Sequence, residues 1–190
     1  MNVYDFDKTI YDGDSTLHFY FYCIKKQPII LIWLPFQMWA LVIYLLGIID
    51  KTKFKQDFYI FLKSITNIDD LINSFWNINV KRIKQWYIKK QQIDDVIISA
   101  SPEFLLTPIC DMINIKYLIA SKVNKLNGGY DGINCYGEEK VNRFNHLFPN
   151  NYILEFYSDS LADAPLAMVA QKSYIVQKDI IVSWEKYRSL

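Results

Sequence analysis

Short apolar runs recur along the chain and constrain its fold more than any other sequence feature. They are rich in β-branched and aromatic residues, which suits strands that are buried in a parallel sheet. The runs cover residues 1–4, 95–99, 117–120, 152–157 and 173–176. Segments with helical periodicity separate them, so strands and helices alternate. This alternation predicts an α/β fold with a parallel sheet.

Two carboxylates and a hydroxyl follow the first run directly. Asp5 and Asp7 stand two residues apart, so on a strand their side chains would point the same way, and Thr9 comes two residues later. In open α/β sheets, ligands bind at the carboxyl ends of the strands. Adjacent carboxylates repel, and both ionise only if a cation holds them. The stretch therefore predicts a nucleophilic or metal-binding carboxylate with a helper beside it, and a plain polar turn is the alternative.

A serine ends the second run at a point where a helix is expected to follow. Ser101 is placed to cap this helix and Pro102 to be its first residue. A serine at a strand end, facing a helix N-terminus, can bind a phosphate oxygen. Ser99 is therefore a candidate phosphate ligand, with an ordinary structural serine as the alternative.

A lysine and a second pair of carboxylates complete the set of polar candidates. Lys140 lies in the first turn of a helix predicted over residues 137–148, where the helix dipole favours anions rather than cations. Asp159 and Asp163 follow the fourth apolar run. Because the carboxyl ends of parallel strands share one edge of a sheet, we expect all these side chains to lie close together.

A stretch of 21 residues without a charged side chain, residues 29–49, is long enough to span a membrane. Pro35 lies within it and is expected to be the place where the segment bends back. Lysines flank both ends: Lys25, Lys26, Lys51, Lys53 and Lys55. Some candidate site residues precede the stretch and others follow it, so both flanks must share one compartment, which excludes a single crossing. The stretch then dips into the membrane and returns, lies in the interface, or packs as an apolar helical cap. Lysines on both sides agree with both ends being cytoplasmic.

Other elements are predicted from local patterns. Helices are expected over residues 54–65 and 69–92, where apolar side chains recur at helical spacing. Residues 123–135 are expected to form a small hairpin that turns at Asn127 and Gly128. The segment after residue 177 is ambiguous.

Composition narrows the class of protein. The net charge of +1 predicts no nucleic-acid binding, because that function needs a basic surface. Three scattered cysteines without metal-ligand spacing suit free thiols in a reducing cytoplasm. Charged residues from Asp5 onward stand where a signal peptide would be apolar. We therefore expect a cytoplasmic protein, with a peripheral position on the cytoplasmic face of the membrane left open, and no oligomeric state is predicted.

Taken together, the motifs resemble those of the haloacid dehalogenase superfamily of phosphohydrolases. Asp-Phe-Asp-Lys-Thr from Asp5 to Thr9 is similar to its first motif, the stretch ending at Ser99 to its second, Lys140 to its third, and residues 158–163 to its fourth. Residues 99–104 and 135–140 resemble the phosphoserine-phosphatase-like branch. The resemblance implies a Rossmann-like core domain of residues 1–14 and 93–190. A helical cap, residues 15–92 with its apolar segment 28–49, would be inserted between the first and second motifs.

The resemblance also implies a mechanism. Asp5 would attack phosphorus to form an aspartyl-phosphate, and Asp7 would act as general acid and then as general base. Mg²⁺ would be bound by Asp5, the Asp7 backbone carbonyl and Asp159. Ser99 and Lys140 would bind the phosphoryl oxygens. Asp163 would orient Lys140 or a metal-bound water. Thr9 would brace the turn that positions Asp7, or bind phosphate.

The substrate is expected to be a phosphate ester, and the apolar insertion suggests a lipid one. That insertion is similar to the one in phosphatidylglycerophosphate phosphatases of the same branch. Phosphoserine phosphatases tend to have a glutamate soon after the first motif, whereas the nearby acids here are Asp12 and Asp14. The alternatives are a phosphatase of a small soluble metabolite such as phosphoserine, and a membrane-associated protein that kept the fold without catalysis.

Overall fold

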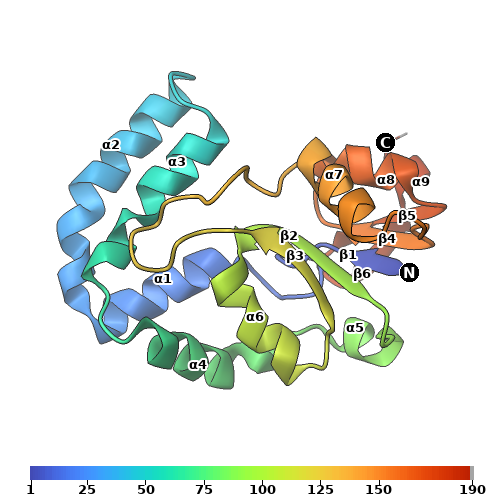
Figure 1. Cartoon of the computed structure of the whole chain (residues 1–190), viewed down its shortest axis with the longest axis horizontal. Helices are drawn as coiled ribbons and strands as arrows, with labels where there is room; N and C mark the ends of the chain where they lie inside the picture. Colours follow the sequence, from blue (N-terminus) through green and yellow to red (C-terminus); the bar gives the residue numbers. More distant parts are fainter. Residues whose placement is uncertain (189–190) are drawn as a thin grey trace.

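The computed structural model describes residues 1–188, which form a twisted sheet flanked by helices and a helical cap (Figure 1). The sheet order is β3-β2-β1-β4-β5-β6, and all neighbouring strands are parallel except β5 and β6. The strands are β1 Asn2–Tyr4, β2 Val96–Pro102, β3 Tyr117–Ser121, β4 Glu155–Ser158, β5 Lys172–Gln177 and β6 Ile180–Ser183. The predicted α/β fold with a parallel, Rossmann-like sheet is confirmed.

Helices connect the strands and build the cap. Those near the sheet are α5 Gln85–Lys90, α6 Glu103–Met112, α7 Glu138–Leu147, α8 Ala164–Val169 and α9 Trp184–Arg188, with a 3-10 turn η4 at Leu161–Asp163. The cap contains α1 Ser15–Lys26, α2 Leu34–Leu45, α3 Lys51–Phe58 and α4 Ile68–Asn79, joined by the 3-10 segments η1 Pro28–Trp33, η2 Tyr59–Ser64 and η3 Val80–Arg82.

Side chains alternate between two apolar cores, one on each face of the sheet. On β1, Val3 packs into a core with Phe144 and Phe156, while Tyr4 packs into a larger core that continues into the cap. The larger core includes Trp76 of α4, whose indole nitrogen donates a hydrogen bond to the Leu105 carbonyl at 2.6 Å. The cap therefore shares one core with the sheet. The division into core and cap domains stays a prediction. Helix α5 lies in the part of the chain that was assigned to the cap, but its Tyr87 ring packs on Tyr4 of β1, with 4.9 Å between the ring centroids.

The apolar segment forms one arm of a helical hairpin. Helix α2 lies beside α3, and the two project at the end of the molecule opposite α7, α8 and α9 (Figure 1). The rings of Tyr44 and Phe54 stack across the two helices at 4.9 Å. Pro35 begins α2 rather than bending the segment back on itself, and the chain reverses only after Leu45. The predicted return point at Pro35 was therefore wrong.

Some local predictions also need correction. The helix predicted over residues 69–92 is broken at Ile83, which pairs with Tyr11 in an isolated antiparallel bridge, because this stretch carries the chain back from the cap to the sheet. The helix predicted over residues 54–65 begins earlier, at Lys51, and tightens into η2. The predicted hairpin at residues 123–135 is reduced to one bridge between Val123 and Tyr130.

The chain turns slightly before the predicted position, at residues 125–127, and the backbone of Gly128 explains why glycine follows the turn. Its φ is +78°, and a Cβ at this position would lie 2.5 Å from the Tyr59 carbonyl oxygen. The loop is therefore shaped by close contact with the cap rather than by strand pairing.

Candidate active site

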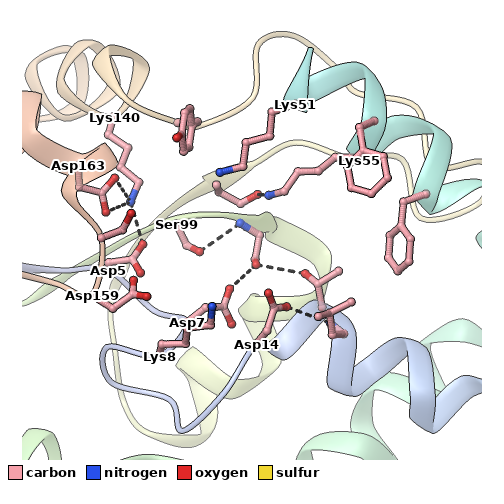
Figure 2. A pocket seen from close by; sticks show the side chains of 18 of the residues that line it. Asp5, Asp7, Lys8, Asp14, Lys51, Lys55, Ser99, Lys140, Asp159 and Asp163 are labelled. Atoms are coloured by element: carbon pink, nitrogen blue, oxygen red, sulfur yellow. Dashed lines mark hydrogen bonds and ion pairs between the residues drawn. The ribbon is translucent and has the colours of Figure 1, made fainter. Parts of the chain in front are cut away.

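The carboxyl ends of β1, β2 and β4 line a pocket of about 370 Å³ between the sheet and the cap (Figure 2). The structure brings Asp5, Asp7, Ser99, Lys140, Asp159 and Asp163 together around it. The sequence analysis expected these residues at the ends of successive strands, with Lys140 at the start of a helix. Their chemical roles stay predictions, but the structure places their side chains together at one edge of the sheet, as expected.

Lys140 lies between two carboxylates. Its Nζ donates hydrogen bonds to Asp5 Oδ1 and Asp163 Oδ2, both at 2.8 Å, and Asp163 also accepts a hydrogen bond from the Ser158 hydroxyl at 2.7 Å. Burial disfavours the ammonium form, but Asp5 and Asp163 outweigh it and raise the pKa of Lys140. An ammonium group has three protons to donate. Nζ also lies 2.8 Å from Asp163 Oδ1, so three carboxylate oxygens of Asp5 and Asp163 lie within reach of its three protons.

Asp5 is buried and close to other acids. Burial raises its pKa to about 7, Lys140 opposes this shift, and Asp163 and Asp159 add to it. The Thr9 hydroxyl donates to Asp5 Oδ2 at 3.4 Å and accepts a hydrogen bond from the Asp159 backbone N–H at 2.9 Å. Thr9 therefore ties the first motif to the fourth.

The position of Thr9 corrects its predicted role. Its side chain is fully buried and does not line the pocket, so the structure does not support phosphate binding by Thr9. It braces Asp5 and the backbone of Asp159, rather than the turn that positions Asp7.

Asp7 is held by groups from the cap side and from β2. The Ser15 backbone N–H, at the start of α1, donates to its Oδ1 at 2.6 Å, and the Ser101 hydroxyl donates to its Oδ2 at 2.5 Å. The Thr16 hydroxyl lies 3.2 Å from that of Ser101. Burial raises the pKa of Asp7, and the nearby Asp14 adds to the shift.

Ser101 does not cap helix α6, so the prediction for this residue was wrong. Strand β2 continues to Pro102, which takes the N-cap position of α6 without a side-chain hydrogen bond. The Ser101 backbone N–H donates to the Ser99 hydroxyl at 3.1 Å. Ser99 is buried at the pocket wall, and among the described residues no acceptor is found for its hydroxyl proton.

The donor atoms suit Mg²⁺. Asp5 and Asp159 both line the pocket, and burial raises the pKa of Asp159 as it does that of Asp5. A cation bound between two such carboxylates would relieve their repulsion. In residues 1–188, no three His, Cys, Asp or Glu side chains converge as a ready-made metal cluster. The set that fits is two carboxylates with the Asp7 backbone carbonyl and water, and Mg²⁺ usually keeps several waters.

Sequence reasoning missed the cap residues that line the pocket. Four of them lie on α3: Lys51, Phe54, Lys55 and Phe58. Tyr136, in the loop before α7, also lines the pocket and was missed as well. The spacing of Lys51 and Lys55, four residues apart, could have indicated a shared helix face. From the sequence, both lysines were expected only to flank the apolar stretch.

Comparisons with known proteins agree with the fold. Residues 3–168 match the family described as haloacid dehalogenase-like hydrolase. Among solved structures, a protein of unknown function from Bordetella pertussis Tohama I has a TM-score of 0.73 at 16% identity and covers 91% of this chain and 87% of its own. A substrate-bound phosphoserine phosphatase complex has a TM-score of 0.58 at 14% identity and covers 90% and 82%.

Two curated relatives match part of the chain. Protein CicA of Caulobacter vibrioides (strain NA1000 / CB15N) is 30% identical over 86 residues, which is 42% of this chain and 39% of that protein. Histidinol-phosphatase of Neisseria meningitidis serogroup C (strain 8013) is 29% identical over 98 residues, 45% of this chain and 44% of that protein. The aligned region thus covers less than half the length of either relative.

Proposed function

The chain belongs to the haloacid dehalogenase-like hydrolase family, and on this premise we propose that it is a Mg²⁺-dependent phosphomonoesterase acting through an aspartyl-phosphate. The observation that carries this proposal is the convergence of Asp5, Asp7, Lys140 and Asp159 on one pocket. The preferred substrate is a phosphorylated lipid head group, of which phosphatidylglycerophosphate is an example.

Asp5 is the nucleophile in this proposal. Its carboxylate attacks phosphorus, a P–O bond forms, and the bond to the leaving alcohol oxygen breaks. Mg²⁺, when bound by Asp5, Asp159 and the Asp7 carbonyl, offsets the negative charge of the phosphoryl group. The positive charge of Lys140, which contacts Asp5, stabilises the negative charge of a phosphoryl oxygen, and Ser99 donates its hydroxyl proton to another.

Asp7 moves the protons. Burial raises its pKa, which favours the protonated form needed to donate a proton to the leaving oxygen. The resulting carboxylate then takes a proton from the water that attacks the aspartyl-phosphate, which releases inorganic phosphate and restores Asp5. The hydrogen bonds from Ser15 and Ser101 keep the carboxyl group of Asp7 in place through both steps.

The exposure of α2 supports a lipid substrate. Residues Pro28–Leu45 are long and apolar enough to cross a membrane by length and composition, but only 17% of them are buried. Ile32, Trp39 and Leu45 are 59%, 63% and 73% exposed. An apolar helix that served as cap core would be buried, so the exposed face argues against this alternative.

One relationship connects this exposed face with the pocket. Helix α3 packs beside α2, where Phe54 stacks on Tyr44, and the same Phe54 lines the pocket together with Phe58. Seating α2 in the head-group region of a bilayer would bring the pocket to the lipid surface. The chain reverses after Leu45 and returns along α3 to the pocket, so we propose peripheral contact without crossing, on the cytoplasmic face. Lys25 and Lys26 are exposed before the segment, and in this proposal they meet anionic lipid.

A soluble metabolite is the second candidate substrate. It is favoured by the relative from Neisseria meningitidis, whose name is histidinol-phosphatase. A screen separates the candidates: purified protein is assayed on lipid and soluble phosphate esters, with and without Mg²⁺. Turnover of a lipid phosphate in mixed micelles above that of phosphoserine and histidinol phosphate supports the lipid proposal. Preference for a soluble ester rejects it, and no turnover of any ester, including a generic aryl phosphate, rejects the phosphatase itself.

A further inference from the structure

Two lysines enter the active-site pocket from the cap. Lys51 and Lys55 lie one turn apart on α3, and both line the pocket. Figure 2 shows their side chains extending from α3 across the space above Asp5 and Asp7, while Lys140 enters from the opposite side. The pocket thus has a positive charge at its base and a separate positive pair at its cap wall.

The contacts of the two ammonium groups leave their charge without a counter-ion. Lys51 Nζ lies 3.9 Å from the centroid of the Tyr136 ring, and Lys55 Nζ donates to the Ala100 carbonyl oxygen at 2.8 Å. Within residues 1–188 neither forms an ion pair with a carboxylate, unlike Lys140, which has two. Burial lowers the pKa of Lys55 to about 8, and the nearby Asp7 and Asp14 offset this desolvation only in part.

The neighbouring lysine shows that the arrangement is specific to the pocket face. Lys53 lies between them in sequence but points outward and pairs with Asp57 at 2.6 Å. Two unpaired cations on the inner face, next to a paired one on the outer face, indicate a binding site for an anion.

We propose that Lys51 and Lys55 bind a second phosphate group of the substrate, a phosphodiester, while its phosphomonoester lies at Asp5. The inference rests on the proposed phosphatase function and specifies its substrate class. Two ammonium groups can each donate to one of the two free oxygens of a phosphodiester. Phosphoserine fits less well, because the carboxylate that it offers to these lysines is attached to the same carbon as an ammonium group, which they repel.

The aromatic residues around the pair fit the same substrate. Phe54 and Phe58 lie on the same helix and present apolar surface beside the lysines. A glycerol backbone with acyl chains, attached to the diester, would leave the pocket along α3 toward the exposed face of α2. The lysine pair thus lies between the site of hydrolysis and the apolar hairpin.

Two soluble esters with the same phosphomonoester test the proposal. They are glycerol 3-phosphate and the deacylated head group glycerophosphoglycerol phosphate, which adds a phosphodiester. The wild type, Lys51→Gln/Lys55→Gln, both single variants and the outward control Lys53→Gln are compared on kcat and KM. We expect the double variant to lose roughly tenfold to a hundredfold more kcat/KM on the diester compound than on glycerol 3-phosphate, mainly through KM. The control keeps the wild-type ratio between the substrates.

Equal losses on both compounds, or an unchanged ratio, would overturn the proposal. A failure of the phosphatase function is seen separately, as absence of turnover by the wild type on either ester. In that case calorimetric titration of Asp5→Asn, with and without the two lysine substitutions, still decides the question. Tighter binding of the diester compound that depends on the lysines supports the site, and equal binding of the two compounds rejects it.

Discussion

The Ser101 hydroxyl donates a hydrogen bond to Asp7 Oδ2, although 94 residues separate the two in sequence. The bond joins the end of β2 to the turn after β1, and the Ser101 backbone N–H at the same time donates to Ser99. Ser101 therefore holds the Asp7 carboxyl group and the Ser99 hydroxyl in place. We regard it as a positioning residue.

Replacing Ser101 with alanine should lower kcat roughly tenfold with a smaller change in KM, because Asp7 loses a hydrogen bond to its charged form. Ser101→Thr, which keeps the hydroxyl, should restore most of the rate. Steady-state kinetics on an aryl phosphate measures both. If threonine rescues no better than alanine, the hydroxyl is not what matters at this position.

Asp5→Asn should abolish turnover while the protein stays folded. An amide has nearly the same shape but is a poor nucleophile, so the expected loss is several orders of magnitude. Lys140 keeps its contact with Asp163, which limits the structural effect. Turnover is measured after circular dichroism has shown a native fold, and a near-normal rate would exclude Asp5 as the nucleophile.

Exhaustive chelation should remove activity, and Mg²⁺ should restore it. The expected ligands Asp5, Asp159 and the Asp7 carbonyl offer only oxygen atoms, which suit hard cations. Mn²⁺ should replace Mg²⁺ better than Zn²⁺ does. Full activity in the chelated protein, checked by elemental analysis, would rule out the metal's role.

Binding of the diester-containing ester should weaken as the pH rises through about 8. The charged form of Lys55 binds the anion, and this form is lost above its pKa of about 8. Asp7 and Asp14 favour the charged form, whereas Lys51 and Lys140 oppose it. The fall in kcat/KM between pH 7 and 9, relative to glycerol 3-phosphate, measures the effect.

Arginine at position 55 provides the control for this pH dependence. The guanidinium group of Lys55→Arg stays charged over the same range, so the relative fall should largely disappear. An identical pH dependence in the arginine variant would show that another group titrates.

Leu34→Lys/Leu45→Lys should release the protein from anionic vesicles. Both side chains are exposed on α2, by 42% and 73%, and burying a charge in the apolar interface is costly. Flotation with liposomes measures binding, and Ile93→Lys, at an 84% exposed position outside the hairpin, serves as the matched control. Failure of the wild-type protein to bind anionic vesicles would reject the membrane proposal.

The sheet and the central residues could be predicted because they depend on short-range patterns. An apolar run followed by a polar residue, such as Asp5, Ser99 or Asp159, predicts both a buried strand and the polar side chain at its carboxyl end. Once the strands are parallel, their ends must meet, so the convergence of these side chains follows from the topology.

The rest depends on contacts between distant segments, which no local pattern encodes. Ser101 has the sequence of a helix cap, but Asp7 competes for its hydroxyl and β2 continues past it. The loop at Gly128 has the sequence of a hairpin, but contact with Tyr59 of the cap replaces strand pairing. The direction in which Lys51 and Lys55 point depends on how α3 packs on α2, which charge spacing alone does not reveal.

The exposed face of α2 has a consequence for how the protein would meet its substrate. A phosphatase anchored by this helix diffuses in the plane of the membrane rather than through the solution. Its pocket, lined by α3, then stays at the membrane surface. Its rate then follows the mole fraction of substrate in the surface rather than the bulk concentration. Diluting the lipid substrate with a neutral lipid, at constant total substrate, would slow such an enzyme, whereas an enzyme that takes its substrate from solution would not be affected.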